Sequence, residues 1–206
     1  MIVAIDGPAG AGKGTLAKSL ATRLGLRHLD SGALYRATAL QILREGGDPA
    51  DPATAERAAR ALDPALLGVP ELRLVEVGSA ASLVAAIPTV RQALLDFQRE
   101  FARTPPGAVV DGRDIGTVVL PDAPVKLYVT ASTDERARRR HQELLGRGEP
   151  SIYERVRAEI EARDARDSGR AVAPMRKADD AVEIDTTDLT PEQVLARALA
   201  VIAARS

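Results

Sequence analysis

Short strand-like runs alternate along the chain with longer segments in which apolar residues recur every three or four positions. The short runs lie at residues 1–6, 27–30, 108–111, 125–129 and 181–184, and their length is typical of strands. The longer segments are typical of helices that bury one face. Five strands that alternate with helices predict a three-layer α/β fold with a mostly parallel sheet.

Glycines and prolines mark where the first predicted helices begin and end. Leu16, Leu20 and Leu24 share one face of a helix over 13–24, which Gly25 ends. Further helices are expected over 33–45, 52–62 and 79–87.

A longer helix should begin at Pro88 and end before Pro105. Its apolar residues are spaced for one buried face and are Val90, Leu94, Phe97 and Phe101. Residues 66–78 have the least readable pattern of the chain. Within them, Leu72, Leu74 and Val75 predict a short strand.

Three helix starts in the second half of the chain have capping-box spacing, in which a hydroxyl residue precedes Glu or Gln by three positions. They are Ser132 with Glu135, Ser151 with Glu154, and Thr190 with Gln193.

The first predicted strand leads directly into a glycine-rich segment that ends in a lysine and a threonine. Its residues are Gly7, Pro8, Ala9, Gly10, Ala11, Gly12, Lys13, Gly14 and Thr15. Glycines allow a loop to bring backbone N–H groups close to phosphate oxygens, and the lysine adds a positive charge. The pattern Gly-x-x-x-x-Gly-Lys, after a strand and before a helix, predicts a phosphate-binding loop. The alternative is a Gly/Ala-rich turn without chemical importance.

One position of this loop departs from the usual pattern. A serine or threonine normally follows the lysine and ligates magnesium, but here Gly14 follows it and the hydroxyl comes at Thr15. We therefore expect Mg²⁺ to be held mainly by the phosphates of ATP and by water, without a metal site of protein ligands.

Composition excludes several functions. The net charge is −1, from 28 basic and 29 acidic residues, which argues against a general nucleic-acid or membrane-surface binder. The chain has no cysteine and only two histidines, His28 and His141, so thiolate chemistry is excluded and each histidine is expected to be incidental. No apolar run has membrane-spanning length and no signal-peptide pattern is evident, so a cytoplasmic protein is expected.

Polar residues follow two of the predicted strands, where ligands of parallel sheets bind. Ser31 lies at a helix start with Arg36 about one turn further on, which favours a second phosphate site over a simple cap with a surface arginine. Asp111 is placed to order a magnesium-bound water, and Arg113 and Asp114 should point into the same crevice. The alternative for this second segment is a tight turn with an internal ion pair.

Two arginine-rich segments follow the fourth predicted strand. The denser one contains Arg136, Arg138, Arg139, Arg140 and Arg147. It predicts a mobile cover over phosphates, although a solvated helix face is the usual explanation of such a run. Between 163 and 170 the charges alternate, and intrahelical ion pairs are the default explanation there.

Five stretches together resemble the cytidylate kinase family of bacteria. They are IDGPAGAGKGT, LDSGALYR, SLVAAIPTVR, VVDGRDIGTVVLPDAPVKLYV and RDARDSGRAVAP, spread from Ile5 to Pro174 in family order. The resemblance implies a monomeric P-loop kinase domain over 1–206, with sheet order 2-3-1-4-5. It also implies a monophosphate-binding segment over 31–104 and an arginine-rich lid over 132–170. Long-form members of the family have a larger insert near 66–78.

The resemblance also assigns residues. ATP would bind Gly7 to Thr15, and the catalytic residues would be Lys13, Arg36, Arg113 and Arg139. The CMP-binding residues would be Ser31, Arg36 and Arg113 at the monophosphate, Ser82, Arg91 and Asp114 at cytosine, Arg163 and Asp167 at the ribose, and Arg170 on the phosphate side.

The reaction implied is ATP + CMP ⇌ ADP + CDP, with dCMP as a further acceptor and small nucleotides as the partners. Phosphoryl transfer needs positioning and charge neutralisation more than acid–base chemistry. Two alternatives remain open. One is another small-molecule P-loop kinase with UMP, AMP or a metabolite as acceptor. The other is a non-catalytic nucleotide-binding regulator, which would not need arginines on the acceptor side.

Overall fold

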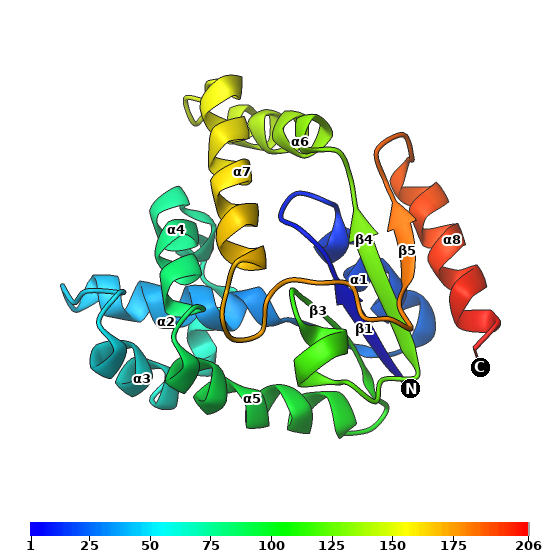
Figure 1. The fold of residues 1–206 in the computed structure, drawn as a ribbon, viewed down its shortest axis with the longest axis horizontal. Coiled ribbons are helices and arrows are strands. Elements are labelled where there is room, and N and C mark those ends of the chain that lie inside the picture. Colours follow the sequence, from blue (N-terminus) through cyan, green and yellow to red (C-terminus); the bar gives the residue numbers. More distant parts are fainter. Residues whose placement is uncertain (206) are drawn as a thin grey trace. The chain divides into compact units, whose positions relative to one another are not determined.

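The computed structural model describes residues 1–205 and contains a parallel five-stranded sheet in the order β2-β3-β1-β4-β5 (Figure 1). The strands are β1 (Ile2–Asp6), β2 (Arg27–Asp30), β3 (Ala108–Gly112), β4 (Val125–Thr130) and β5 (Val182–Asp185). β1 is central and pairs in parallel with β3 and β4, and β4 pairs in parallel with β5. The predicted fold class and strand order are therefore confirmed.

The chain divides into two compact units. The sheet unit contains Met1–His28 and the chain from Pro105 onward, and the helical unit is Leu29–Thr104. The helices of the sheet unit are α1 (Lys13–Leu24), α6 (Thr133–Gly146), α7 (Tyr153–Ser168) and α8 (Pro191–Ala203). A π-helical turn, η3 (Ile115–Val119), follows β3 and was not predicted.

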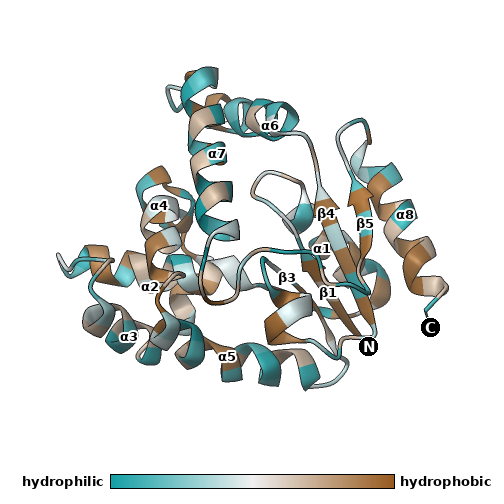
Figure 2. Cartoon of the chain, in the orientation of Figure 1, coloured by the Kyte–Doolittle hydropathy of each residue, from teal (hydrophilic) through white to brown (hydrophobic). Residues whose placement is uncertain are grey.

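Apolar strand residues form the core of the sheet unit. Val3, Ile5 and Val129 are fully buried, and Leu20 of α1 and Ala198 of α8 pack into the same cluster. The strands β1 and β4 are coloured largely hydrophobic in Figure 2. A sheet buried in this way holds the ends of its strands, and the loops that follow them, in fixed positions.

The helical unit consists of α2 (Ser31–Arg44), α3 (Pro52–Arg60), α4 (Val75–Val84) and α5 (Pro88–Arg103), with two 3-10 helices, η1 (Pro64–Gly68) and η2 (Pro70–Arg73). Its core joins Leu34 and Ile42 of α2 to Ala55, Val84 and Val90. The helix α2 begins two residues earlier than predicted because the Asp30 carboxylate accepts a hydrogen bond from the Ala33 N–H.

The strand predicted at Leu72, Leu74 and Val75 is wrong. Leu72 lies in η2, and Val75 is the first residue of α4. Pro70 fixes φ in the range that begins a helical turn, and Leu72 is buried against Leu40 and Val77 of neighbouring helices. The segment is therefore helical, because Leu72 packs against helices and not in a sheet.

The predicted buried face of α5 is half wrong. Val90 and Leu94 are buried, but the stripe continues through Gln98 and Ala102, and Phe97 is 40% exposed. The buried side-chain amide of Gln98 donates its NH₂ group to the Leu94 C=O at 3.0 Å, while its oxygen has no hydrogen-bond partner among the described residues.

Two of the three predicted helix caps are present. Thr190 and Gln193 form a complete capping box at α8, and Ser132 accepts from the Glu135 N–H at α6. Ser151 does not cap α7, because its hydroxyl lies 2.8 Å from His141 Nδ1 instead. Among residues 1–205, no helix has the length and apolar character needed to cross a membrane.

Candidate functional site

The glycine-rich loop joins β1 to α1, as predicted. Gly7 and Gly12 have φ values of 143° and 89°, in the region that favours glycine. A Cβ atom on Gly7 would lie 1.9 Å from the Val129 carbonyl oxygen, so no side chain fits there. Lys13 is buried, and its Nζ donates to the Pro8 C=O at 2.7 Å. The Lys13 side chain therefore reaches back to the start of the loop and is hydrogen-bonded to its backbone.

Two arginines of α6 contact residues of this loop or lie beside it. Arg136 is buried, donates to the Ala9 C=O at 3.2 Å and pairs with Asp164 of α7 at 2.7 Å. A Cβ atom on Gly12 would lie 3.9 Å from Arg139 Nη1. The arginine-rich segment therefore places Arg136 and Arg139 next to the phosphate loop.

Arg139 is held in place from two sides. It donates to Glu135 Oε1 at 2.7 Å and to both oxygens of Thr186, at 3.0 Å to the hydroxyl and 2.7 Å to the C=O. Thr186 follows β5 and donates its own hydroxyl proton to the Ala11 C=O of the loop at 3.1 Å. Sequence reasoning missed Thr186, because this contact depends on how β5 meets the loop.

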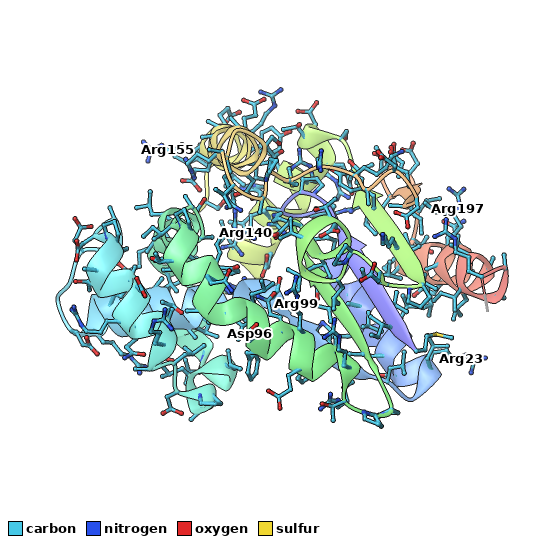
Figure 3. The ribbon with its side chains drawn as sticks, turned by 60° about the horizontal axis from the view of Figure 1, so that its bottom comes forward. Arg23, Asp96, Arg99, Arg140, Arg155 and Arg197 are labelled. Atoms are coloured by element: carbon cyan, nitrogen blue, oxygen red, sulfur yellow. The ribbon has the colours of Figure 1, made fainter. Side chains whose placement is uncertain are left out.

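The other arginines of this segment form pairs within α6 or at its end. Arg138 pairs with Glu135 at 2.6 Å, and Arg140 pairs with Glu143 at 2.8 Å. Arg147 also pairs with Glu143. Figure 3 labels Arg140 on α6 and Arg155 on α7, and Arg155 is exposed. The simpler explanation, a solvated helix face, fits Arg138, Arg140 and Arg147 in this structure.

Asp6, at the end of β1, holds the turn that follows Asp114. Its two carboxylate oxygens accept from the Ile115 and Gly116 N–H groups, both at 2.7 Å. Burial raises the pKa of Asp6 to about 6, although these two hydrogen bonds and Lys13 lower it. Asp6 was not predicted to have this role, because its partners lie more than a hundred residues along the chain.

Asp167 gathers three of the arginines that the resemblance assigned to CMP. Arg113 Nε lies 3.0 Å from Asp167 Oδ2, Arg170 Nη2 lies 2.5 Å from Oδ1, and Arg163 Nε lies 4.0 Å from Oδ2. Burial alone would raise the pKa of Asp167, but Arg113, Arg170 and Arg163 together lower it. The pair with Arg163 lies within α7 and the pair with Arg170 lies at its end, as expected for alternating charges along a helix. The pair with Arg113 connects α7 to the residue after β3.

Asp111 and His28 face each other from β3 and β2. His28 Nε2 lies 2.8 Å from Asp111 Oδ1, and both side chains are largely buried. A Cβ atom on Gly14 would lie 4.0 Å from Asp111 Oδ2. The carboxylate predicted to order a magnesium-bound water therefore lies beside the phosphate loop.

In the helical unit, Arg36 of α2 is held by Asp30. Arg36 Nη2 lies 2.6 Å from Asp30 Oδ2. A Cβ atom on Gly32 would lie 3.0 Å from both side chains, so glycine leaves room for this pair. Ser31 is the first residue of α2 and is buried. Asp30, which caps α2 and orients Arg36, was missing from the residues expected at this site.

Ser82 of α4 and Arg91 of α5 are buried in the helical unit. Arg91 Nη1 donates to the Ala85 C=O at 3.1 Å, and its guanidinium carbon lies 5.6 Å from the centre of the Tyr35 ring. This distance is in the range of a cation–π contact. Arg91 is thus fixed in orientation, and Tyr35 is a further residue that sequence reasoning missed.

Residues 1–205 contain no group of three or more His, Asp or Glu side chains arranged to hold a metal ion. The acidic side chain that lies beside Gly14, the residue after Lys13, is that of Asp111.

The family to which the chain belongs follows from comparison with known proteins. The family described as cytidylate kinase matches residues 3–204. The chain belongs to the cytidylate kinase family. The cytidylate kinase of Methylobacterium sp. (strain 4-46) is 61% identical over 100% of this chain and 98% of its own length. That of Paramagnetospirillum magneticum is 56% identical over 99% and 98%. The resemblance to cytidylate kinases is therefore confirmed.

Solved structures support the fold of this family member. A putative kinase from Chloroflexus aurantiacus has a TM-score of 0.51 at 16% identity, covering 100% of this chain and 97% of its own. An uncharacterized protein from Eubacterium ventriosum has a TM-score of 0.58 at 16% identity, covering 100% and 99%. At these identities the likeness concerns the fold alone.

Proposed function

We propose that the protein transfers the γ-phosphoryl group of ATP to CMP, forming ADP and CDP, and that it also accepts dCMP. The observation that carries this proposal is the family match over nearly the whole chain, at up to 61% identity among the relatives named above. The phosphate loop with its buried lysine supports the same reaction. We further propose a monomer that works in the cytoplasm in pyrimidine nucleotide metabolism.

The reaction needs no general base. An anionic oxygen of the CMP phosphate attacks the γ-phosphorus, and the bond from that phosphorus to the β,γ-bridging oxygen breaks as ADP leaves. Catalysis then consists of positioning and of neutralising phosphate charge. We expect the N–H groups of the loop and Lys13 to do this on the donor side. Lys13 would exchange its hydrogen bond to the Pro8 C=O for phosphate oxygens.

A magnesium ion that enters with ATP would take its ligands mainly from phosphates and water. It would add positive charge at the transferring group. Asp111, beside Gly14, fits the task of ordering one of the metal's water molecules. Thr15 would contribute its hydroxyl and N–H within the loop.

We expect each unit to contribute its own set of CMP-binding residues. In the helical unit these are Ser31 and Arg36 for the monophosphate and Ser82 and Arg91 for cytosine. In the sheet unit they are Arg113 for the monophosphate, Asp114 for cytosine, Arg163 and Asp167 for the ribose, and Arg170 on the phosphate side. Asp30 and Asp167 hold Arg36 and Arg113 in defined orientations, which reduces the entropy that binding would cost.

The region 132–170 is proposed as the lid. Arg139, beside Gly12, is our first choice for the residue that covers the transferring phosphoryl group. Closure would exclude water and so suppress ATP hydrolysis.

An ADP-release assay with several acceptors tests this function. We expect the highest kcat/KM with CMP and dCMP, and much lower values with UMP, AMP and shikimate. A higher value with any of the last three would assign the protein to another small-molecule kinase activity. ADP release with none of them would favour a nucleotide-binding regulator.

A further inference from the structure

His28 was expected to be incidental, but its imidazole contacts one of the site's carboxylates. His28 Nε2 and Asp111 Oδ1 are 2.8 Å apart, with side-chain exposures of 18% and 8%. A carboxylate only accepts hydrogen bonds, so the Nε2 nitrogen of His28 carries the hydrogen and donates it. The two residues come from neighbouring strands, joined where the Arg27 N–H donates to the Gly107 C=O.

The other oxygen of Asp111 is the one that faces the phosphate loop. A Cβ atom on Gly14 would lie 4.0 Å from Oδ2. Gly14 stands where this type of loop usually has a hydroxyl that ligates magnesium. A nearby carboxylate can instead accept hydrogen bonds from the water shell of a nucleotide-bound magnesium ion, and Asp111 Oδ2 lies beside this position.

We propose that His28 is a positioning residue for the donor nucleotide's magnesium ion. By donating to Oδ1, it fixes the rotation of the Asp111 carboxylate and so keeps Oδ2 turned toward the loop. Hydrogen-bonded neighbours of this kind orient groups that serve a metal, and losing one typically weakens metal binding by about 10-fold or more. The role of the magnesium ion rests on the proposed function.

Two substitutions separate this role from a structural one. In His28→Gln an amide N–H can still reach Asp111, whereas His28→Leu retains bulk but no donor. The measurement is the affinity for ADP by titration calorimetry, once with magnesium chloride and once with a chelator. We expect His28→Leu to weaken ADP binding about tenfold with magnesium and not at all with the chelator. His28→Gln should stay close to the wild type in both conditions.

Turnover adds a second readout. His28→Leu should need about tenfold more magnesium for half-maximal rate, with an unchanged KM for CMP. In an Asp111→Asn background, His28→Leu should have no further effect on the magnesium requirement, because the group it positions is already lost. Thermal unfolding of each variant identifies any that fails to fold, and His28→Gln then decides between the explanations.

Several results would overturn the proposal. One is equal loss of ADP affinity with and without magnesium, which would make His28 a support of the loop as a whole. Another is an unchanged affinity of His28→Leu for ADP in the presence of magnesium. Neither depends on CMP turnover, so a failure of the proposed CMP kinase activity would appear separately in the acceptor assay.

Discussion

At the scale of single residues, several acidic side chains of this protein each hold a basic side chain from another element. Asp167 holds Arg113, Asp111 holds His28, and Asp30 holds Arg36. Asp167 and Asp111 are buried, so removing the partner of either carboxylate is expected to be costly, whereas Asp30 is partly exposed. These pairs therefore both stabilise the fold and fix the orientation of groups expected to bind nucleotide.

Asp114 is expected to determine the choice of base. Its carboxylate only accepts hydrogen bonds, which suits the amino group of cytosine and repels the carbonyl that uracil has at the same position. Each polar mismatch should be worth roughly 1–3 kcal/mol. We predict that Asp114→Asn reduces the preference for CMP over UMP, because the amide can turn its NH₂ group toward the uracil carbonyl.

The measurement is the ratio of kcat/KM for CMP to that for UMP in both proteins. Asp122→Asn is a matched control, since Asp122 is exposed and lies on the same connection between β3 and β4. An unchanged ratio in Asp114→Asn would show that Asp114 does not read the base.

Asp6 predicts a pH dependence of stability. Its pKa in the folded protein is about 6, raised from 3.8. Below both values the carboxyl is protonated in folded and unfolded chains alike. As pH rises through this window the unfolded chain releases its proton first, so Asp6 makes the folded state progressively less stable, by roughly 3 kcal/mol in total. Asp6→Asn removes this titration.

The test is chemical unfolding of the wild type and Asp6→Asn between pH 4 and pH 7. The difference in free energy of unfolding, Asp6→Asn minus wild type, should increase as pH rises over this range. Its value at pH 4 need not be zero, because the substitution also replaces an acceptor of the Gly116 or Ile115 N–H. A constant difference across the range would contradict the raised pKa.

At the scale of elements, the lid is the part expected to respond to nucleotides. Arg136 already ties α6 to the loop, whereas Arg138, Arg140 and Arg147 pair with α6 glutamates. We predict that ADP and CDP together slow hydrogen exchange of the amides in α6 and α7, because closure orders this region. Amides of α8, outside the lid region, serve as the control. Exchange that stays the same in α6 and α7 would leave Arg138, Arg140 and Arg147 as a solvated helix face.

Elements were predictable where the local pattern and the tertiary packing agree. The strands, the glycine-rich loop and the helix that Gly25 ends follow from apolar runs and from residues with special backbone preferences. The strand predicted at Leu72 failed because Pro70 begins a 3-10 turn there and Leu72 packs against Leu40 and Val77 of neighbouring helices. The face of α5 failed at Phe97 because Gln98 takes the buried position, where its side-chain NH₂ group donates to the Leu94 C=O.

Candidate residues of the site can be named from sequence motifs, but the contacts among them cannot. Lys13, Arg113, Asp114 and Asp167 lie within recognisable stretches of sequence. Their partners depend on contacts between distant parts of the chain, as between Asp6 and Ile115 or between His28 and Asp111. No local pattern encodes such contacts, which is why the roles of Asp6, His28 and Asp30 became visible only in the structure.

At the scale of the whole molecule, the sheet unit contains the phosphate loop and the helical unit contains Ser31, Arg36, Ser82 and Arg91. The function proposed for the chain requires both sets of residues. A nucleotide-binding regulator would require the loop alone. The central claim is therefore that the γ-phosphoryl group is transferred to CMP and not merely released.

The most direct measurement follows ATP labelled at its γ-phosphate in a mixture with CMP and magnesium. We predict that the label leaves ATP and appears in CDP, one molecule for each ADP formed, while inorganic phosphate stays at background. Lys13→Ala should remain folded and transfer label far more slowly, because it loses a charge that acts on the transition state. Label that appears mainly as inorganic phosphate, or that stays in ATP with the wild-type protein, would contradict the account.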